Sequence, residues 1–243
     1  MNTEIRNPQG EKLDYAFHEG GSGASALVII GHGVTGNKDR PWDIALSEAL
    51  SAAGFHALRF SFAGNGDSEG EFHDSTITKE VGDLGAVIDA ATDAGYSNIV
   101  YAGHSMGGAV GVLRTSTDDR IQYLISLAGM VHTAKFAEVE FGEETLDQGF
   151  MWEDEDCPLS STFVKDMNSI GSVLDKASSI EVPWLLIHGT GDDVVPIEES
   201  REIFAAANEP KEFIELPDVD HVFNDAGLQP MIDAVTSWLG DMV

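Results

Sequence analysis

The sequence has little cysteine, few basic side chains and no long apolar run, and each of these features excludes a class of structure or partner. Cys157 is the only cysteine among 243 residues, which excludes an intrachain disulfide and a cysteine-based zinc site. No apolar run approaches the ~20 residues that a helix needs to span a bilayer. The N-terminal stretch holds neither an apolar core nor a small-residue cleavage site, so it does not resemble a secretory signal. We therefore expect a cytoplasmic protein.

Basic residues are also scarce relative to acids. Lys and Arg number 13 against 42 Asp and Glu, which gives a formal net charge of −29 at pH 7. The acids are spread along the whole chain, and the 42% hydrophobic content argues against disorder. Such a surface repels nucleic-acid phosphates and anionic lipids, so we expect neither a nucleic-acid nor a membrane partner. Two interpretations stay open: an ordinary acidic protein, and adaptation to a salty cytoplasm or a brine or marine habitat.

Apolar runs alternate with amphipathic stretches from one end of the chain to the other, which is typical of βα units on a mostly parallel sheet. We expect an α/β fold in a single domain over 1–243, because the sequence contains no repeat, low-complexity segment or linker. An antiparallel edge strand is expected at 13–18, followed by strands at 26–30, 56–62, 98–102, 121–128, 183–188 and 212–216. The expected helices are 42–53, 77–94, 106–115, 197–207 and 230–239.

The stretch 131–180 breaks this alternation, because it is far longer than an ordinary connection between two strands. It is rich in aromatic and acidic residues and has weak helical periodicity, which indicates an inserted cap over one end of the sheet. Its aromatic side chains are candidates for substrate contact, among them Phe136, Phe150 and Trp152. The alternative is a pair of packing helices that do not touch the substrate.

A candidate nucleophile follows the strand expected at 98–102. The residues Gly103-His104-Ser105-Met106-Gly107 form a G-x-S-x-G motif between that strand and an Ala/Val-rich helix. A serine on such a tight turn needs neighbours without side chains, because the helix crosses close to the strand. At the N-terminus of a helix, free N–H groups and the helix dipole favour developing negative charge. The motif therefore predicts Ser105 as a nucleophile.

An acid and a histidine follow in the chain order of one class of catalytic triad. Asp192 and Asp193 come just after the strand expected at 183–188, at the edge where open parallel sheets bind ligands. His221 lies on the loop after the last strand. Chemically, Ser105 needs a neutral imidazole as its base, and His221 needs a buried carboxylate to fix its tautomer. The remaining strand-end and turn histidines are interpreted as packing or turn residues; they are His32, His104 and His188.

Together these motifs resemble the α/β-hydrolase superfamily over essentially the whole chain, in particular small bacterial cinnamoyl/feruloyl-type serine esterases. The run His32-Gly33-Val34-Thr35-Gly36 after the first buried strand carries part of this resemblance. The resemblance implies the α/β-hydrolase fold, with a helical cap at 131–180 inserted before the acid-bearing strand. Its spacing favours Asp192 over Asp193 as the acid, and it implies an oxyanion hole formed by the backbone N–H groups of Val34 and Met106.

The resemblance implies a carboxylic ester hydrolase that works through an acyl-enzyme on Ser105, with His221 as base and Asp192 as its orienting acid. We expect short-to-medium acyl esters as substrates, with aromatic acyl esters as a further option. The same residues leave a thioesterase, amidase or lactonase open, and so does a catalytically silent binding module. We expect no cofactor and no metal, since no His-x-His or His-x-x-x-His pair occurs. The partner expected is a small-molecule ester, and the chain is expected to be a monomer or a homodimer.

Overall fold

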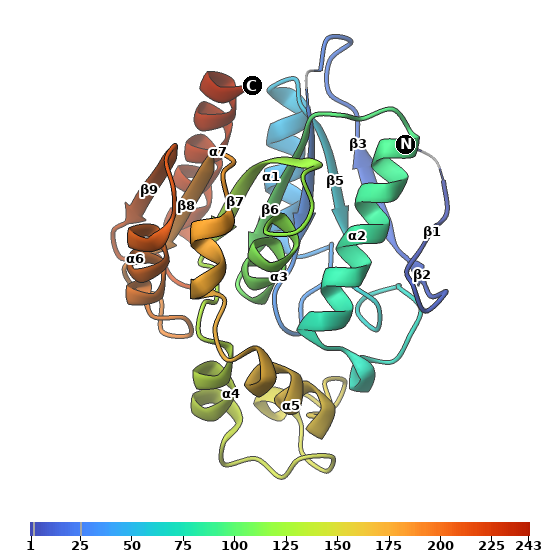
Figure 1. The fold of residues 1–243 in the computed structure, drawn as a ribbon, viewed down its shortest axis with the longest axis vertical. Coiled ribbons are helices and arrows are strands. Elements are labelled where there is room, and N and C mark those ends of the chain that lie inside the picture. The colour runs from blue at the N-terminus through green and yellow to red at the C-terminus, as the bar shows by residue number, and fades with distance from the viewer. Residues whose placement is uncertain (2, 25) are drawn as a thin grey trace.

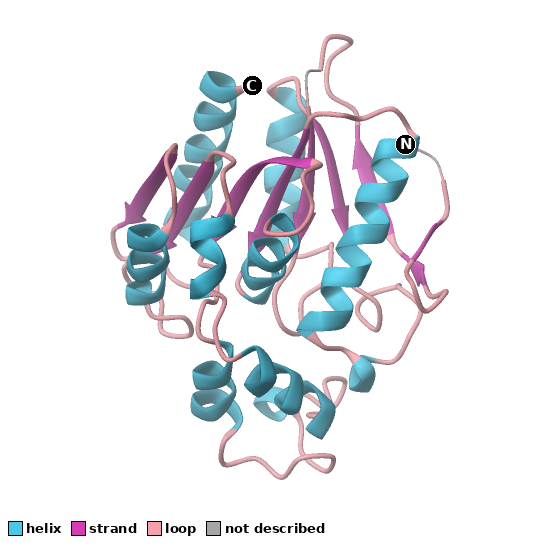
Figure 2. Ribbon diagram, in the orientation of Figure 1, coloured by secondary structure: helices cyan, strands magenta, loops and turns pink. Residues whose placement is uncertain are grey.

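The computed structural model describes residues 1, 3–24 and 26–243 and is organised around one seven-stranded sheet (Figures 1 and 2). The strands lie in the order β3-β5-β4-β6-β7-β8-β9. The edge strand β3 runs antiparallel to β5, and the other neighbouring pairs in this sheet are parallel. The strand bounds are β3 Tyr15–His18, β4 Leu27–Gly31, β5 His56–Phe60, β6 Ile99–His104, β7 Ile121–Leu127, β8 Trp184–Gly189 and β9 Lys211–Leu216.

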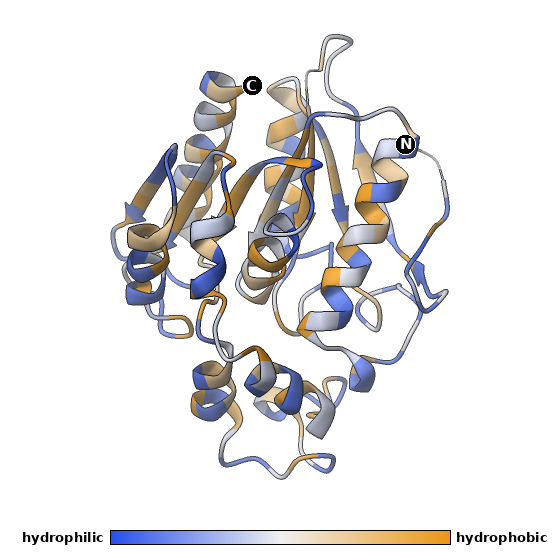
Figure 3. Ribbon diagram, viewed as in Figure 1, coloured by the Kyte–Doolittle hydropathy of each residue, from blue (hydrophilic) through white to orange (hydrophobic). Residues whose placement is uncertain are grey.

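Helices cover both faces of the sheet. On one face α1 (Pro41–Ala52) packs beside α7 (Leu228–Met242), and on the other lie α2 (Ile77–Asp93), α3 (Met106–Thr115) and α6 (Ile197–Ala206). The central strands are buried on both faces, so β4 and β6 have no exposed position. Figure 3 shows the apolar residues gathered on these strands and on the helix faces that cover them. This two-sided burial explains why the strands read as continuous apolar runs in the sequence.

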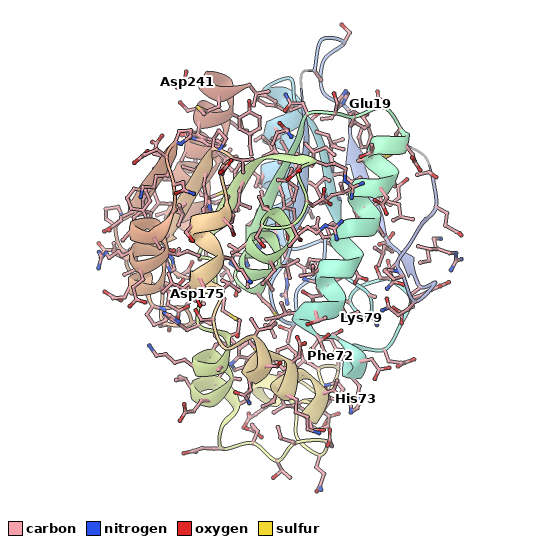
Figure 4. All side chains as sticks on the ribbon, in the orientation of Figure 1. Glu19, Phe72, His73, Lys79, Asp175 and Asp241 are labelled. Carbon is pink, nitrogen blue, oxygen red and sulfur yellow. The ribbon has the colours of Figure 1, made fainter. Side chains whose placement is uncertain are left out.

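The parallel strands all end at the same edge of the sheet, and the residues between β7 and β8 lie beyond that edge (Figure 1). We call residues 128–183 the β7–β8 insertion. It contains α4 (Thr133–Phe141), η2 (Met151–Glu153), α5 (Ser161–Ile170) and η3 (Leu174–Ser179). The insertion is tied to the core beside α2, where Asp166 accepts hydrogen bonds from the backbone and hydroxyl of Thr78. Phe72 and His73 of η1 (Phe72–Asp74) lie at the same junction (Figure 4).

The expected strands and helices are confirmed to within about three residues, with one difference near the N-terminus. The expected edge strand at 13–18 is divided, because Leu13 ends β2 (Lys12–Leu13) and β3 begins only at Tyr15. Strand β2 pairs with β1 (Ile5–Arg6) in a separate two-stranded ribbon. Asp14, between β2 and β3, donates its backbone N–H to Ser68 Oγ. The last short helix, η4 (Asp225–Gly227), precedes α7. No helix in the described part of the chain is long and apolar enough to cross a membrane.

Candidate active site

Ser105 stands on a strained turn between β6 and α3. Its φ of 53° and ψ of −120° lie outside the regions that side-chain-bearing residues ordinarily occupy. The backbone around it is held from both sides, since the Ser105 amide donates to Leu127 O at 3.0 Å and the Ser105 carbonyl accepts from Met130 N at 3.0 Å. This local geometry places the serine hydroxyl at the carboxyl edge of the sheet, at the start of α3.

The two glycines of the motif make room for this turn. A Cβ atom on Gly103 would collide with the carbonyl oxygen of Gly107, and a Cβ atom on Gly107 would lie 2.5 Å from the carbonyl oxygen of His32. Both obstacles are backbone atoms, which cannot rotate away as a flexible side chain can. The G-x-S-x-G spacing therefore reflects the close crossing of α3 over β4 and β6, as the sequence indicated.

The side chain of Asp192, on the loop after β8, is fully buried, and four donors surround its carboxylate. Its Oδ1 accepts hydrogen bonds from the amides of Val194 and Val195, each at 2.9 Å. Its Oδ2 accepts from His221 Nδ1 at 2.8 Å. Burial raises the pKa of Asp192, but the hydrogen bonds from His188 and His221 outweigh it and hold that pKa below its ordinary value. The structure thus brings Asp192 to His221 and leaves its neighbour Asp193 exposed.

His188 is a second histidine on the same carboxylate, although its sequence position indicated only a packing or turn residue. Its Nε2 lies 3.0 Å from Asp192 Oδ2 and 2.9 Å from the carbonyl oxygen of Val195, and its Nδ1 lies 2.7 Å from Ser200 Oγ. A carbonyl oxygen can only accept, so Nε2 carries the hydrogen and Nδ1 accepts from the hydroxyl. The only sequence feature that could have indicated this contact is the spacing of four residues between His188 and Asp192.

His104 supports His221 from the opposite side. Its ring lies between two others, with centroid distances of 4.9 Å to Trp42 and 4.8 Å to His221. Its Nε2 lies 2.8 Å from the backbone carbonyl oxygen of His221 and donates to it. Burial, together with the nearby His221, lowers the pKa of His104 to about 3, so His104 is neutral near pH 7. His104 therefore contacts both the backbone carbonyl and the ring of His221.

The loop after β4 passes close to Ser105. A Cβ atom on Gly33 would lie 2.7 Å from Ser105 Cβ. His32 anchors the loop, because its Nδ1 lies 2.9 Å from the carbonyl of Gly33 and its Nε2 accepts from the amide of Phe62 at 3.1 Å. Burial lowers the pKa of His32 to about 4, so it is a neutral turn residue. Within the described residues, the amides of Val34 and Met106 donate to no protein acceptor.

A cavity of about 570 Å³ opens over Ser105 and His221. Of the three aromatic residues proposed for substrate contact, Trp152 lines this cavity and Phe136 and Phe150 do not. Phe136 is instead buried inside the β7–β8 insertion, where its ring packs against those of Phe141 and Trp152. The lining comprises His32, Gly33, Val34, Thr35, Gly36, Arg40, Pro41, Trp42, His104, Ser105, Trp152, Val194, His221, Val222 and Asn224.

Solved structures share this fold and the position of its elements. Est1E from Butyrivibrio proteoclasticus, in a structure with ferulic acid bound, superposes with a TM-score of 0.84 at 27% identity, covering 99% of this chain and 98% of that one. The Pyrococcus furiosus esterase Pf2001 superposes with a TM-score of 0.76 at 25% identity, covering 99% of this chain and 90% of that one. An uncharacterised protein of Mycobacterium tuberculosis is 28% identical over 223 residues, which are 90% of this chain and 71% of that protein.

The sheet order, the serine on its turn and these likenesses define an α/β-hydrolase. Within that superfamily, the chain belongs to the prolyl oligopeptidase family, whose model matches residues 42–241. The expected resemblance to small bacterial esterases is confirmed by the likeness to Est1E. At this level the protein is a hydrolase with esterases among its structural neighbours.

Proposed function

We propose that the protein is a serine carboxylesterase with Ser105, His221 and Asp192 as its catalytic triad. Ser105 Oγ attacks the ester carbonyl carbon while His221 Nε2 takes the hydroxyl proton. The amides of Val34 and Met106 stabilise the resulting oxyanion, and the alcohol leaves with the proton held by His221. Water then attacks the acyl-enzyme with His221 again as base, which releases the acid and restores Ser105.

One observation carries this proposal. Ser105, on a strained turn, and His221, hydrogen-bonded at 2.8 Å to a buried Asp192, line the same cavity although they come from loops after different strands. Because Nδ1 of His221 donates to Asp192, Nε2 is the ring nitrogen that can accept a proton. A structural serine or a surface histidine would need none of these contacts.

The proposed substrates are esters of short-to-medium acyl chains, with aromatic acyl groups included. The cavity of about 570 Å³ falls within the usual ~300–1,000 Å³ of small-molecule sites. Trp42 and Trp152 give it flat apolar walls, and the likeness to a protein solved with ferulic acid supports an aromatic acyl group. We also propose that residues 131–180 act as a cap, since Trp152 reaches the cavity from this stretch.

Amide hydrolysis by the same residues is the second candidate, and the family description favours it. A prolyl oligopeptidase family model covers residues 42–241, and a peptidase would use the same acyl-enzyme chemistry. The two candidates differ in the leaving group, since an amine must be protonated as it leaves. Assays with a p-nitrophenyl ester and with a proline-containing peptide p-nitroanilide separate them: cleavage of the anilide favours a peptidase, and ester hydrolysis without anilide cleavage favours an esterase.

The experiment that tests the proposal is hydrolysis of p-nitrophenyl esters from acetyl to dodecanoyl, together with methyl ferulate. We expect activity with the shorter esters and, for Ser105→Ala, a loss on the order of a million-fold in turnover. Ser178→Ala, which removes an exposed hydroxyl on η3, is the matched control and should behave as wild type. More than about one per cent of wild-type turnover left in Ser105→Ala, free of contaminating esterase, would contradict the assignment.

A further inference from the structure

The cavity differs in charge from the rest of the molecule. The chain contains 42 acidic residues, yet among the side chains that the structure describes no Asp or Glu lines the cavity over Ser105. Acidic side chains lie elsewhere on the surface, for example Glu19 and Asp241 at the edge of the sheet opposite the β7–β8 insertion (Figure 4). The buried carboxylate of Asp192 is covered by His221 and does not reach the cavity. An anionic ligand inside the cavity would therefore meet no carboxylate from the described lining residues.

Arg40 supplies the permanent positive charge of the cavity lining. The other ionisable lining groups are histidines, and buried His32 and His104 are neutral near pH 7. Arg40 precedes α1 and adjoins Pro41 and Trp42, which also line the cavity. Because an arginine cannot be deprotonated in a protein, this charge is present at every working pH.

The guanidinium of Arg40 is held in place but keeps its charge unpaired. Its Nη2 donates to the carbonyl oxygen of Thr35 at 2.7 Å, on the loop that also carries Val34. Among the described residues it forms no ion pair, whereas neighbouring Lys38 and Arg59 both bind Asp39. A guanidinium has five N–H donors in a planar fork, and one carbonyl uses only part of them. The remaining donors suit a planar carboxylate or a phosphate.

We propose that Arg40 selects substrates that carry a negative charge, so that the protein hydrolyses small esters bearing a carboxylate or phosphate group away from the scissile bond. This inference rests on the proposed esterase function and names the class of its substrates. The long-range field of a chain with charge −29 opposes an anionic substrate. The positive charge of Arg40 would offset that repulsion, but only for a ligand that enters the cavity.

The test uses pairs of methyl esters that differ only at the far end of the acyl chain. Monomethyl succinate, glutarate and adipate are compared with methyl butyrate, valerate and hexanoate, and methyl 5-phosphonopentanoate distinguishes a phosphorus anion from a carboxylate. The readout is the ratio of kcat/KM for the anionic ester to that for its neutral partner. For at least one chain length we expect Arg40→Gln to lower this ratio by about two- to fivefold, because Arg40 is exposed and exposed arginine–carboxylate contacts are weak.

Two further variants make the outcome decisive. Arg40→Lys keeps the charge and should retain part of the ratio, while Lys12→Gln removes a positive charge from β2, outside the cavity lining, and should not change it. An equal ratio in wild type and Arg40→Gln at every chain length, with the neutral esters hydrolysed, would overturn the role of Arg40 and leave the esterase assignment intact. No turnover of either ester class by wild type would instead overturn the esterase assignment and this inference with it.

Discussion

Asp192→Asn tests how the buried carboxylate controls His221. The carboxylate receives four donors, two on each oxygen: the amides of Val194 and Val195 on Oδ1, and the rings of His188 and His221 on Oδ2. A carboxamide offers one oxygen and one NH₂ group, so in either orientation its NH₂ faces two donors. The two backbone amides cannot become acceptors. The NH₂ group therefore turns toward the histidines.

The histidines respond differently to that NH₂ group. His188 keeps Val195 O as an acceptor for its Nε2–H at 2.9 Å, so it loses little. His221 can accept from the NH₂ group only by moving its proton from Nδ1 to Nε2. In that tautomer Nε2 can no longer take the proton of Ser105. We expect a loss of roughly ten-thousand-fold in kcat, which corresponds to about 5.4 kcal/mol of barrier at 1.36 kcal/mol per tenfold.

The assay is steady-state hydrolysis of p-nitrophenyl acetate by wild type, Asp192→Asn and Asp193→Asn, with melting curves for all three. Asp193 is exposed and adjacent in sequence, so it controls for charge removal at this loop. We expect Asp193→Asn to stay within a few-fold of wild-type turnover. Equal losses in the two variants would refute the reasoning, and a larger loss in Asp193→Asn would move the acid to that residue.

Three other predictions concern stability, each measured by thermal melting. Gly107→Ala should lower Tm strongly, because the added Cβ atom would lie 2.5 Å from a backbone oxygen. The control Gly82→Ala should be neutral or stabilising, because its Cβ atom would meet only Pro8, at 3.5 Å. Equal changes in Tm for the two variants would contradict this prediction. Burial raises the pKa of Asp43 in the folded protein well above its ordinary value. As pH rises, Asp43 therefore loses its proton in the unfolded chain before it does so in the folded protein, and the folded protein loses stability from about pH 4 upward. Asp43→Asn removes that loss, so its Tm relative to wild type should improve from pH 4.5 to pH 8; a pH-independent difference would refute it. Added NaCl should raise Tm most steeply up to about 0.2 M, because 42 acids against 13 bases leave an excess of 29 negative charges that repel one another. A flat or falling curve would contradict the repulsion argument.

Much of the fold follows from local patterns in the sequence. Strands β4 and β6 are continuous apolar runs because they are buried on both faces, and α3 begins at Met106 as expected because the glycines around Ser105 fix the turn. The candidate triad residues could be placed at one edge because each follows the carboxyl end of a parallel strand. These features depend on residues that are neighbours in the sequence.

The supporting contacts of the site could not be predicted in this way. His104 touches His221 and Trp42 only because β6, the loop after β9 and the start of α1 converge in space. Phe136 was expected near the substrate, but it lies on the inner face of α4 and packs with Phe141 in the small core of the β7–β8 insertion. Aromatic content alone does not tell which rings fill an insertion's own core and which, like Trp152, reach a cavity.

The central claim is that Ser105 is the nucleophile, and covalent labelling tests it most directly. Wild type and Ser105→Ala are incubated with a fluorophosphonate, and intact mass, peptide mapping and residual esterase activity are followed in parallel. We expect one phosphonyl group per chain on the peptide containing Ser105, activity lost in step with labelling, and no label in the variant. Labelling of another residue in step with inactivation, or an active protein that stays unlabelled, would contradict the claim.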